Sequence, residues 1–594
     1  MAIFSFLGFT ILVAAIAYWS TRGTDEQSSD GYFLGGRSLT AGVIAGSLLL
    51  TNLSTEQIVG LNGSAYQSGL SVMAWETLAA MAMVVTALFL LPRYLKGGLT
   101  TVPQFLADRF DVTTKTLTSG LFLTGYVVVL LPVILYSGSI ALSGMFKIPE
   151  LLHVSDTEAL WICVWGIGIT GSIYAVFGGL KAVAVSDSIN AIGLLIGGIL
   201  IPFFGLMAIG EGSVIDGVNA MMAANPDKFR SMGTKNDPVP FHTIFTGMML
   251  VQLFYWGTNQ QIIQRALAAK NLAEGQKGLL LGAFIKILGP LIVVLPGLIA
   301  YHIFGDGLAS VDDAYPKLVN KVLPASLLGF FAAVLFGAIL SSFNSVLNSS
   351  VTLFGIDIYK QHFNPDADDK TVVKYGKMFG IVLAFAAMLI APLIANAGSL
   401  FTYLQEINGI YSIPILTIIF VGYFTKSVPA IAAKIGLVSG SLLYIISQFV
   451  MKPMFMADAK APLIASLKSG FLSKLDQSKI LVNTTEEQAT VLKKSIDFDN
   501  LSNDQIHNLG SILDVDTSRL DLLVSGAYPH FLDVMAILFV LNVIIMLLIG
   551  KLNPRAAPYK LTYTKQVDIT PFKYIKEFGI AICVIVIGIY WYFA

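Results

Sequence analysis

Polar side chains interrupt two long apolar stretches of this chain. Residues 47–50 (SLLL) lead into the polar cluster 51–57 (TNLSTEQ), and residues 248–251 (MMLV) lead into the cluster 252–260 (QLFYWGTNQ). Hydrocarbon offers polar groups no partners, so such clusters in membrane spans mark functional sites. Unwound backbone there exposes carbonyl oxygens to a cation, and half-helix N-termini favour electronegative solute groups. The alternative is two helix-packing seams held by interhelical hydrogen bonds.

A third polar stripe lies in residues 338–350, AILSSFNSVLNSS. On a helix, Ser341, Ser345, Asn348 and Ser349 share one face. Their hydroxyl oxygens could join the carbonyls of a broken helix around a hard cation, which prefers oxygen ligands. Hydrogen bonding between packed helices is the alternative for this stripe as well.

Isolated ionisable residues also occur at apolar positions, namely Glu76, Lys286 and Asp187. A charge at this depth costs roughly 2.5–3.5 kcal/mol, so such residues normally face the interior of a helix bundle. Glu76 and Lys286 have opposite signs, which fits a structural ion pair or snorkelling towards an interface. It equally fits a donor and an acceptor for a polyhydroxylated ligand, and the sequence leaves both interpretations open.

The elements that must position these residues are membrane-spanning helices. Of the 594 residues, 55% are hydrophobic and 12% are charged, against about 25% charged residues in a soluble protein. Apolar runs of about 20 residues, long enough to cross a bilayer as helix, recur along most of the chain. We therefore predict an all-α polytopic membrane protein that forms one transmembrane domain. The 14 predicted spans are residues 3–20, 39–63, 72–95, 115–145, 158–178, 186–210, 241–265, 275–305, 326–358, 374–395, 400–424, 429–452, 528–550 and 573–593.

Lys and Arg concentrate in the connections that follow odd-numbered spans, some of them counted at helix ends, such as the connection with Arg93 and Arg109 and the one with Arg265 and Lys270. They are sparse in the short connections after even-numbered spans. This asymmetry places the first set in the cytoplasm and both termini outside. We expect an integral protein of the plasma membrane, which is the inner membrane in a bacterium. Because Lys+Arg and Asp+Glu both total 37, charge gives no sign of a nucleic-acid partner, and no obligate protein partner is evident.

The two broken spans lie five spans apart. Five is an odd number, so two five-span repeats would have opposite orientations, which is typical of transporters that bind solute between paired broken helices. We predict a first inverted repeat at 39–210 and a second at 241–452. Residues 453–527 are interpreted as an extracytoplasmic polar insert with short amphipathic helices, and 528–594 as two C-terminal transmembrane helices.

Several motifs resemble the sodium:solute symporter family, and most closely its sodium/sugar branch. They are residues 31–38 (GYFLGGRS), 52–57 (NLSTEQ), 255–265 (YWGTNQQIIQR) and 294–297 (VLPG). The resemblance covers nearly the whole chain apart from residues 453–527. It implies two inverted five-helix repeats, sodium as the coupling ion and no organic cofactor.

The resemblance also implies roles for particular residues. Solute hydroxyls would be bound by Gln57, Glu76, Gln252, Lys286 and Gln405. Tyr255, with Trp256 beside it, would close the site towards the cytoplasm, and an apolar outer gate would consist of Leu61, Trp75 and Phe401. Two departures bear on which sugar is carried: Gln252 replaces a common Asn, and Ala79 replaces a Ser that contacts sugar in a galactose carrier.

For sodium, the resemblance implies the carbonyls of Leu50, Leu53 and Ala338 with the hydroxyls of Ser341 and Ser342. Family members with a second sodium add an acid that matches Asp187 and hydroxyls near Ser345. Asn344 stands where those members carry Ser or Thr. This departure favours one sodium per cycle.

The sequence thus predicts a sodium-coupled symporter that imports a neutral sugar or polyol by alternating access. A symporter for an organic acid or inorganic anion is the alternative. A carboxylate substrate would usually require an Arg in the core, whereas Lys286 is the only cation deep in any predicted span. An intramembrane enzyme or sensor is disfavoured because no span carries an HExxH, paired-Asp or GxSxG motif.

Overall fold

A computed structural model describes residues 2–21, 27–235, 237–308, 310–396, 400–477, 501, 503–513, 515–518 and 520–594. The described residues form helices and no β-strand, apart from two isolated bridges. The chain divides into two compact units, Met1–Ser441 with Leu538–Ala594 and Leu442–Ile537. The predicted all-α class is confirmed.

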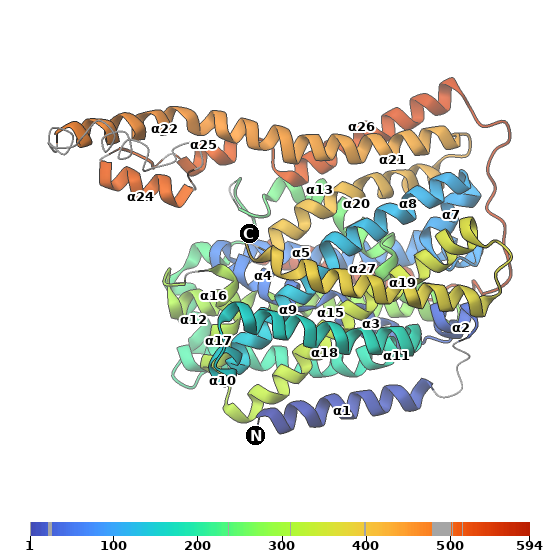
Figure 1. The fold of residues 1–594 in the computed structure, drawn as a ribbon, viewed down its shortest axis with the longest axis horizontal. Coiled ribbons are helices and arrows are strands. Elements are labelled where there is room, and N and C mark those ends of the chain that lie inside the picture. Colours follow the sequence, from blue (N-terminus) through green and yellow to red (C-terminus); the bar gives the residue numbers. More distant parts are fainter. Residues whose placement is uncertain are drawn as a thin grey trace. The chain divides into compact units, whose positions relative to one another are not determined.

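Each predicted span coincides with one helix or with consecutive helices of the structure, shown in Figure 1. In chain order they are α1 (Ala2–Thr21), α3 (Ala41–Asn52) with α4 (Thr55–Ser68), α5 (Ala74–Val85) with η3 (Thr86–Leu90) and α6 (Leu91–Gly97), α8 (Val112–Gly125) with η4 (Tyr126–Leu130) and α9 (Leu131–Phe146), α11 (Asp156–Ile209), α13 (Gly247–Gly257) with α14 (Gln260–Leu267), α15 (Leu272–Val293) with α16 (Leu295–Phe304), α18 (Ala325–Thr352) with η8 (Leu353–Phe363), α19 (Asp369–Ile390) with η9 (Ala391–Asn396), α20 (Leu400–Phe424), α21 (Ala430–Ile445) with η10 (Ile446–Met451), α26 (Phe531–Leu552) and α27 (Ile575–Tyr592).

Shorter helices occupy the connections of the larger unit. They are α2 (Ser29–Leu34), η1 (Gly35–Arg37), η2 (Gly69–Met73), α7 (Val102–Arg109), α10 (Ile148–Leu152), α12 (Val214–Ala224), η5 (Pro226–Phe229), η6 (Phe241–Phe245), η7 (Val311–Asp313) and α17 (Ala314–Val322).

The described residues contain ten helical stretches that are long and apolar enough to cross a membrane, and three shorter apolar helices. The chain is therefore an integral membrane protein. Some of these stretches, such as the 42 residues from Thr55 to Lys96, are longer than a single span needs, and the two halves of the α13–α14 span are too short to be counted. The predicted number of 14 spans stays a prediction for this reason.

The fifth and sixth predicted spans are joined within α11 rather than separated by a loop at residues 179–185. Gly179 alone leaves the helical conformation there, with φ 58° and ψ −175°. A Cβ at this position would lie 3.2 Å from the Tyr32 ring, and a positive φ is strained for other residues. A single glycine therefore makes the kink that the sequence analysis assigned to a connection.

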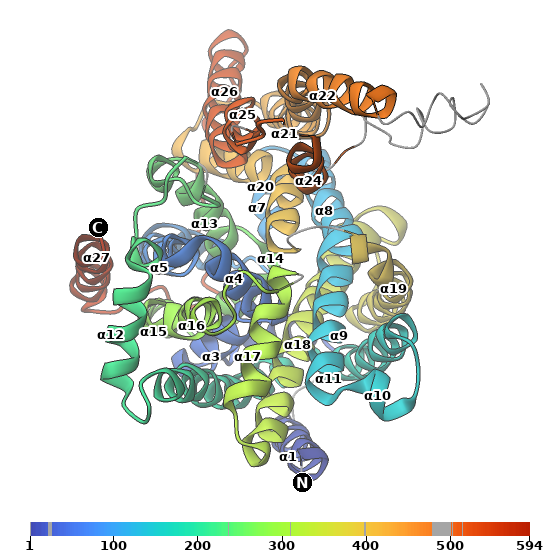
Figure 2. The ribbon, with the colours of Figure 1, turned by 90° about the vertical axis from the view of Figure 1, so that its left-hand side faces the viewer.

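Side-chain caps determine where several spans begin. The Asp111 carboxylate accepts a hydrogen bond from the Thr114 backbone N–H at 2.8 Å at the start of α8, and the Asn271 side chain accepts one from the Glu274 N–H at 2.9 Å at the start of α15. Such caps satisfy N–H groups that have no partner within the helix. In the larger unit α11 packs against α18 and α3, and α15 packs against α3 and α5. Figure 2 shows α27 at the edge of this unit, where it contacts α5 and α15.

The smaller unit contains α22 (Lys452–Gln477), α24 (Asn503–Leu513) and α25 (Leu520–Gly526). Leu467, Ile506 and Leu520 form the buried centre of its own apolar cluster. Helical residues continue without a gap from Ala430 to Gln477, past the predicted end of the twelfth span at residue 452. The polar insert predicted from residue 453 stays a prediction. Residues 478–500 of the predicted insert lie outside the described residues.

Candidate functional site

The second predicted span is broken, as expected, between α3 and α4. Helix α3 ends at Asn52, Leu53 has non-helical dihedrals (φ −79°, ψ 57°), and Ser54 is extended before α4 begins. The last carbonyls of a helix have no partner within it. The backbone oxygens of Leu50 and Leu53, two of the predicted sodium ligands, therefore lie at a buried helix end.

The hydroxyl stripe of α18 faces this break. Ser342 Oγ donates to the Thr51 carbonyl at 3.0 Å, and Thr51 Oγ1 lies 3.0 Å from Ser345 Oγ. Ala338, whose carbonyl is a predicted ligand, is fully buried one turn earlier on the same helix. The structure thus brings the predicted sodium residues of α3 and α18 to one place.

Several buried hydroxyls around the break have no hydrogen-bond partner among the described residues. They are Ser54 Oγ, Thr55 Oγ1 and Ser341 Oγ. A buried polar atom without a partner costs about 1–3 kcal/mol, which is unusual in a native fold unless a ligand completes it. Neutral hydroxyl and carbonyl oxygens are the groups with which broken membrane helices coordinate sodium. The oxygens present therefore fit the ion.

The seventh predicted span is also broken, between α13 and α14. Gly257 ends α13, and the Asn259 side chain caps α14 by accepting from the Gln261 N–H at 3.2 Å. The Tyr126 hydroxyl of η4 donates to the same Asn259 oxygen at 2.6 Å. The break predicted from the cluster 252–260 is thus located at its C-terminal end, at residues 258–259.

Four of the predicted solute ligands lie in one buried polar cluster, and the pairing of Glu76 with Lys286 is direct. Lys286 Nζ donates to the two Glu76 carboxylate oxygens at 2.7 and 2.6 Å, and also to Asn52 Oδ1. Gln57 Nε2 donates to Glu76 Oε1 at 3.1 Å. Both charged side chains are at most 1% exposed. The ion pair that the sequence analysis left open is therefore formed, and it connects α3, α4, α5 and α15.

Gln252 extends this cluster towards two aromatic side chains. Its Nε2 donates to the Trp75 carbonyl at 2.8 Å, and its Oε1 accepts from Trp256 Nε1 at 3.1 Å. The Lys286 ammonium lies 5.5 Å from the centre of the Trp256 ring, within the range of a cation–π interaction. Tyr255 packs edge-on against Trp256 at 5.3 Å between ring centroids.

Two of the three residues predicted as an outer gate, Trp75 and Phe401, are in contact. The Trp75 and Phe401 rings meet edge to face with their centroids 5.1 Å apart, and Leu61 is fully buried in α4. A Cβ on Gly60 would lie 2.7 Å from the Phe401 Cβ, so α4 and α20 are in close contact here. Gln405, the remaining predicted solute ligand, lies one turn after Phe401 and is half-buried. No hydrogen bond described for this chain joins it to the Glu76–Lys286 cluster.

The predicted second-sodium residues are held by a buried cation that the sequence analysis assigned to a cytoplasmic connection. Ser47 Oγ donates to Asp187 Oδ2 at 2.6 Å and accepts from Arg265 Nε at 3.2 Å. Arg265 also donates to Ser345 Oγ and to the Gln261 carbonyl, and it is fully buried. Positive charge is therefore already present beside Asp187. The position of Arg265 at the end of the motif 255–265 gave no signal that it turns back into the bundle.

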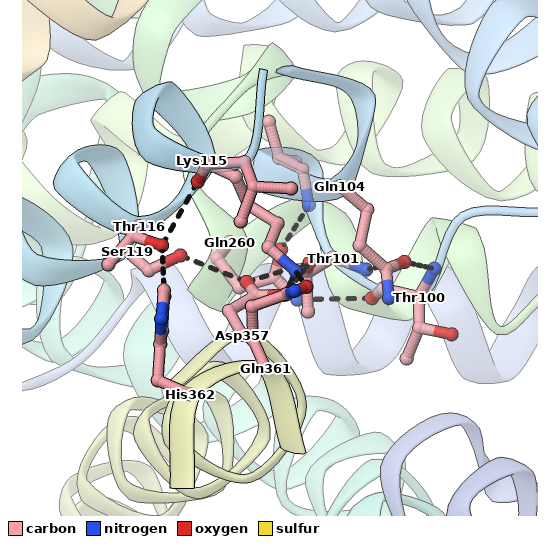
Figure 3. Close-up of polar contacts among 12 residues, drawn as sticks. Thr100, Thr101, Gln104, Lys115, Thr116, Ser119, Gln260, Asp357, Gln361 and His362 are labelled. Atoms are coloured by element: carbon pink, nitrogen blue, oxygen red, sulfur yellow. Dashed lines mark hydrogen bonds and ion pairs between the residues drawn. The ribbon is translucent and has the colours of Figure 1, made fainter. Parts of the chain in front are cut away.

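A second buried polar network lies at the α7–α8 end of the molecule and was not predicted (Figure 3). The Asp357 carboxylate of η8 accepts from Thr101 Oγ1 and Ser119 Oγ, each at 2.9 Å, and lies 3.8 Å from Lys115 Nζ. Lys115 Nζ also donates to Gln361 Oε1 at 2.7 Å. Beside it, Gln260 Oε1 at the start of α14 accepts from the Val102 N–H at 2.8 Å. The network thus joins α7, α8 and η8, and α14 is bound to the same α7 start.

The chain is similar to known proteins in both sequence and fold. The profile of the sodium:solute symporter family matches residues 32–440. The chain is 43% identical over 591 residues to the uncharacterized symporter YidK of Escherichia coli (strain K12), covering 99% of this chain and 90% of that protein. It is 33% identical over 456 residues to a sodium/glucose cotransporter of Vibrio parahaemolyticus, covering 73% of this chain and 82% of the relative. It is 31% identical over 468 residues to the sodium/myo-inositol cotransporter 2 of Homo sapiens, covering 73% of this chain and 68% of the relative.

Among solved structures, a sodium-coupled sialic acid symporter in a substrate-bound outward-open state matches with a TM-score of 0.64. It is 19% identical and covers 76% of this chain and 92% of its own. At this identity the likeness shows the fold alone. The fold is that of a polytopic symporter with broken helices, as the sequence predicted.

Proposed function

Because the chain belongs to the sodium:solute symporter family, we propose that it imports a neutral sugar or polyol together with sodium. Sodium-coupled symport follows from the family. The sugar or polyol is supported by the names of relatives, a sodium/glucose and a sodium/myo-inositol cotransporter. These relatives are transporters, which also argues against an enzyme.

The observation that carries the neutral solute is the Glu76–Lys286 pair. The carboxylate accepts from Gln57 and from Lys286, so the cluster offers both acceptors and donors while its own charges cancel. Solute hydroxyls both donate and accept hydrogen bonds, which suits such a neutral cluster. An acid or inorganic anion, the second candidate, would require a cation free to neutralise it, and Lys286 is already paired. Gln252 and Gln405 are proposed as further solute ligands.

The proposed cycle is alternating access around this site. Sodium bound by Leu50, Leu53, Ala338, Ser341 and Ser342 would order the break between α3 and α4, next to Gln57. Solute would then bind at Glu76 and Lys286, and the Trp75–Phe401 contact with Leu61 would seal the outer side. Opening at Tyr255 and Trp256 would release both to the cytoplasm. The membrane potential contributes ~2.3 kcal/mol per charge per 100 mV to the inward movement of sodium.

We further propose that the repeats are residues 39–210 and 241–452, that both termini are extracytoplasmic and that the membrane is the plasma (bacterial inner) membrane. The concentration of Lys and Arg after odd-numbered spans supports this orientation. One sodium per cycle is supported by Arg265, whose positive charge lies beside Asp187 and Ser345.

Uptake into proteoliposomes tests the proposed function. A radiolabelled panel of hexoses, inositol, sialic acid, proline and iodide would be compared with and without an inward sodium gradient. Sodium-dependent accumulation of a neutral sugar or polyol is expected. Sodium-dependent accumulation of sialic acid or iodide instead would support sodium symport but contradict the proposal that the solute is neutral.

The Ser341→Ala variant is expected to weaken sodium binding much more than it weakens the fold. Ser341 Oγ is buried and forms no close hydrogen bond, although it lies beside the Asp187 carboxylate, so its removal should cost the fold no more than about 1 kcal/mol. We expect roughly tenfold weaker sodium affinity in a site that loses one of its ligands. Half-saturating sodium for uptake and the thermal unfolding midpoint without sodium measure the two effects. An unchanged sodium dependence would remove Ser341 from the site.

The Gly60→Ala variant is expected to slow uptake by preventing closure of the outer gate. Its Cβ would lie 2.7 Å from the Phe401 Cβ, and overpacking of this kind costs about 1–3 kcal/mol, which corresponds to roughly fivefold or more in rate. Initial uptake rates measure the effect. Gly42→Ala in α3 is the control, because a Cβ there meets nothing within 4 Å. Equal rates for both variants would contradict the assignment of the gate.

A further inference from the structure

The buried charged side chains of the larger unit form opposite pairs, with two exceptions. Among the described residues, the buried acidic and basic side chains are Glu56, Glu76, Arg109, Lys115, Asp187, Arg265, Lys286 and Asp357. Lys286 pairs with Glu76, Lys115 lies beside Asp357, and Arg265 is joined to Asp187 through Ser47. A buried charge is costly unless it is paired, so the two that remain need an explanation.

The buried positive charge of Arg109 is stabilised by backbone carbonyl oxygens. Its guanidinium donates to the carbonyl oxygens of Gly422, Thr425 and Val428, at 2.9, 3.2 and 3.0 Å. These oxygens lie at the C-terminal end of α20 and just beyond it, where a helix favours a cation. Arg109 therefore serves the fold at an end of the membrane domain.

Glu56 has no such explanation. Its side chain is 7% exposed, it forms no ion pair among the described residues, and its Oε2 has no hydrogen-bond partner there. It lies in the first turn of α4, where the helix dipole favours a carboxylate. The dipole at a helix N-terminus amounts to about half an elementary charge, so it leaves part of the negative charge unbalanced.

The position of Glu56 connects it to both proposed ligands. It follows Leu53, a proposed sodium ligand, by three residues, and it precedes Gln57, which bonds to Glu76. Glu56 thus lies in the first turn of α4, directly after the break at Leu53 and next to a residue of the solute cluster.

The proposed sodium ligands themselves carry no charge. They are backbone carbonyls of Leu50, Leu53 and Ala338 and the hydroxyls of Ser341 and Ser342. A negative charge near a cation held by neutral oxygens strengthens its binding, because electrostatic attraction is less screened in a region of low dielectric constant.

We infer that Glu56 is the counter-charge for the transported sodium. This inference rests on the proposed function and deepens it. Glu56 acts through its charge and positions the ion without being one of its ligands. In its ionised form, Glu56 gives the empty site a negative charge, which sodium binding neutralises.

Direct sodium binding to the purified full-length protein, without solute, tests the inference. Binding of radioactive sodium would be measured by scintillation proximity for the wild type and Glu56→Gln. The variant keeps the size of the side chain, replaces one acceptor oxygen by an NH2 donor and removes the charge. We expect about tenfold weaker sodium binding, since a unit charge within roughly 10 Å at an effective dielectric constant near 20 contributes this much.

Two further variants separate charge from structure. Glu56→Asp retains the charge and should bind sodium within about threefold of the wild type. Glu56→Asn introduces a side chain of the same size as Asp but without the charge, and it should bind sodium as weakly as Glu56→Gln. Glu158→Gln is the control, because Glu158 is also a first-turn helix carboxylate but is exposed at the start of α11. It should leave binding unchanged.

The outcomes distinguish this inference from the proposed function. If Glu56→Gln binds sodium as strongly as the wild type, Glu56 is not the counter-charge. The same follows if Glu56→Asp and Glu56→Asn weaken sodium binding equally. In both cases the proposed sodium-coupled symport stands. If the wild type binds no sodium at all, the proposed sodium site fails together with the inference.

Discussion

The Lys286→Ala variant is expected to abolish sodium-driven solute uptake. Lys286 Nζ donates to both carboxylate oxygens of Glu76, at 2.7 and 2.6 Å, and to Asn52. Removal of one partner of a buried ion pair costs about 3–5 kcal/mol, because the other charge is left unpaired. A proposed solute donor is lost as well. Together these losses predict at least about a hundredfold lower initial rate of uptake in proteoliposomes, since each 1.4 kcal/mol corresponds to a factor of ten.

A second variant separates the solute contact from the ion pair. In Lys286→Ala combined with Glu76→Gln no charge remains unpaired, so the free energy of unfolding should recover most of what Lys286→Ala alone loses. Uptake should stay abolished, because the ammonium and the carboxylate offered to the solute are both gone. Wild-type uptake by this double variant would show that the pair is structural and that the solute binds elsewhere.

The Asp357→Ala variant is expected to lower the free energy of unfolding by about 3–5 kcal/mol, the cost of breaking a buried charge pair. Asp357 is fully buried and accepts from Thr101 and Ser119 while lying beside Lys115 (Figure 3). Without it, the Thr101 and Ser119 hydroxyls lose their acceptor, and the Lys115 ammonium loses its opposite charge. Denaturant unfolding of the detergent-solubilised protein, followed by circular dichroism, measures the loss.

The matched control is Asp369→Ala. Asp369 also pairs with a lysine, Lys360, at 3.6 Å, but the two side chains are 47% and 42% exposed. Pairs at the surface contribute about 0–1 kcal/mol. A loss of stability as large in Asp369→Ala as in Asp357→Ala would mean that burial of the network is not the cause.

The sequence alone predicted much of the fold because the bilayer restricts what a chain can do. Apolar runs of bilayer length must form helices, since hydrocarbon leaves no other way to satisfy the backbone, and each predicted span is helical in the structure. The same reasoning located both broken helices, at Leu53 and Thr258, because polar residues within apolar runs need a special reason. These signals are local, so neighbouring residues suffice to read them.

Other features depended on the tertiary structure. From the sequence, Glu76 and Lys286 were either a pair or two solute contacts, and only the packing of α5 against α15 shows that they are bonded. Arg265 ends the seventh predicted span, 241–265, and was counted with the connection after it, yet it turns inward to Ser47 and Ser345. The Asp357 network was missed altogether. The kink of α11 at Gly179 lies where the sequence analysis expected a connection between two spans.

The difference has one physical cause. Hydropathy and backbone breaks are properties of a few consecutive residues, and they determined that this protein is a helical membrane transporter with a broken-helix site. Charge pairing depends on which helix faces lie together, and the partners here are far apart in the chain: Glu76 and Lys286 are 210 residues apart, and Thr101 and Asp357 are 256 apart. Only the folded arrangement of helices decided which buried charges are balanced and which, like Glu56, have no ion pair among the described residues.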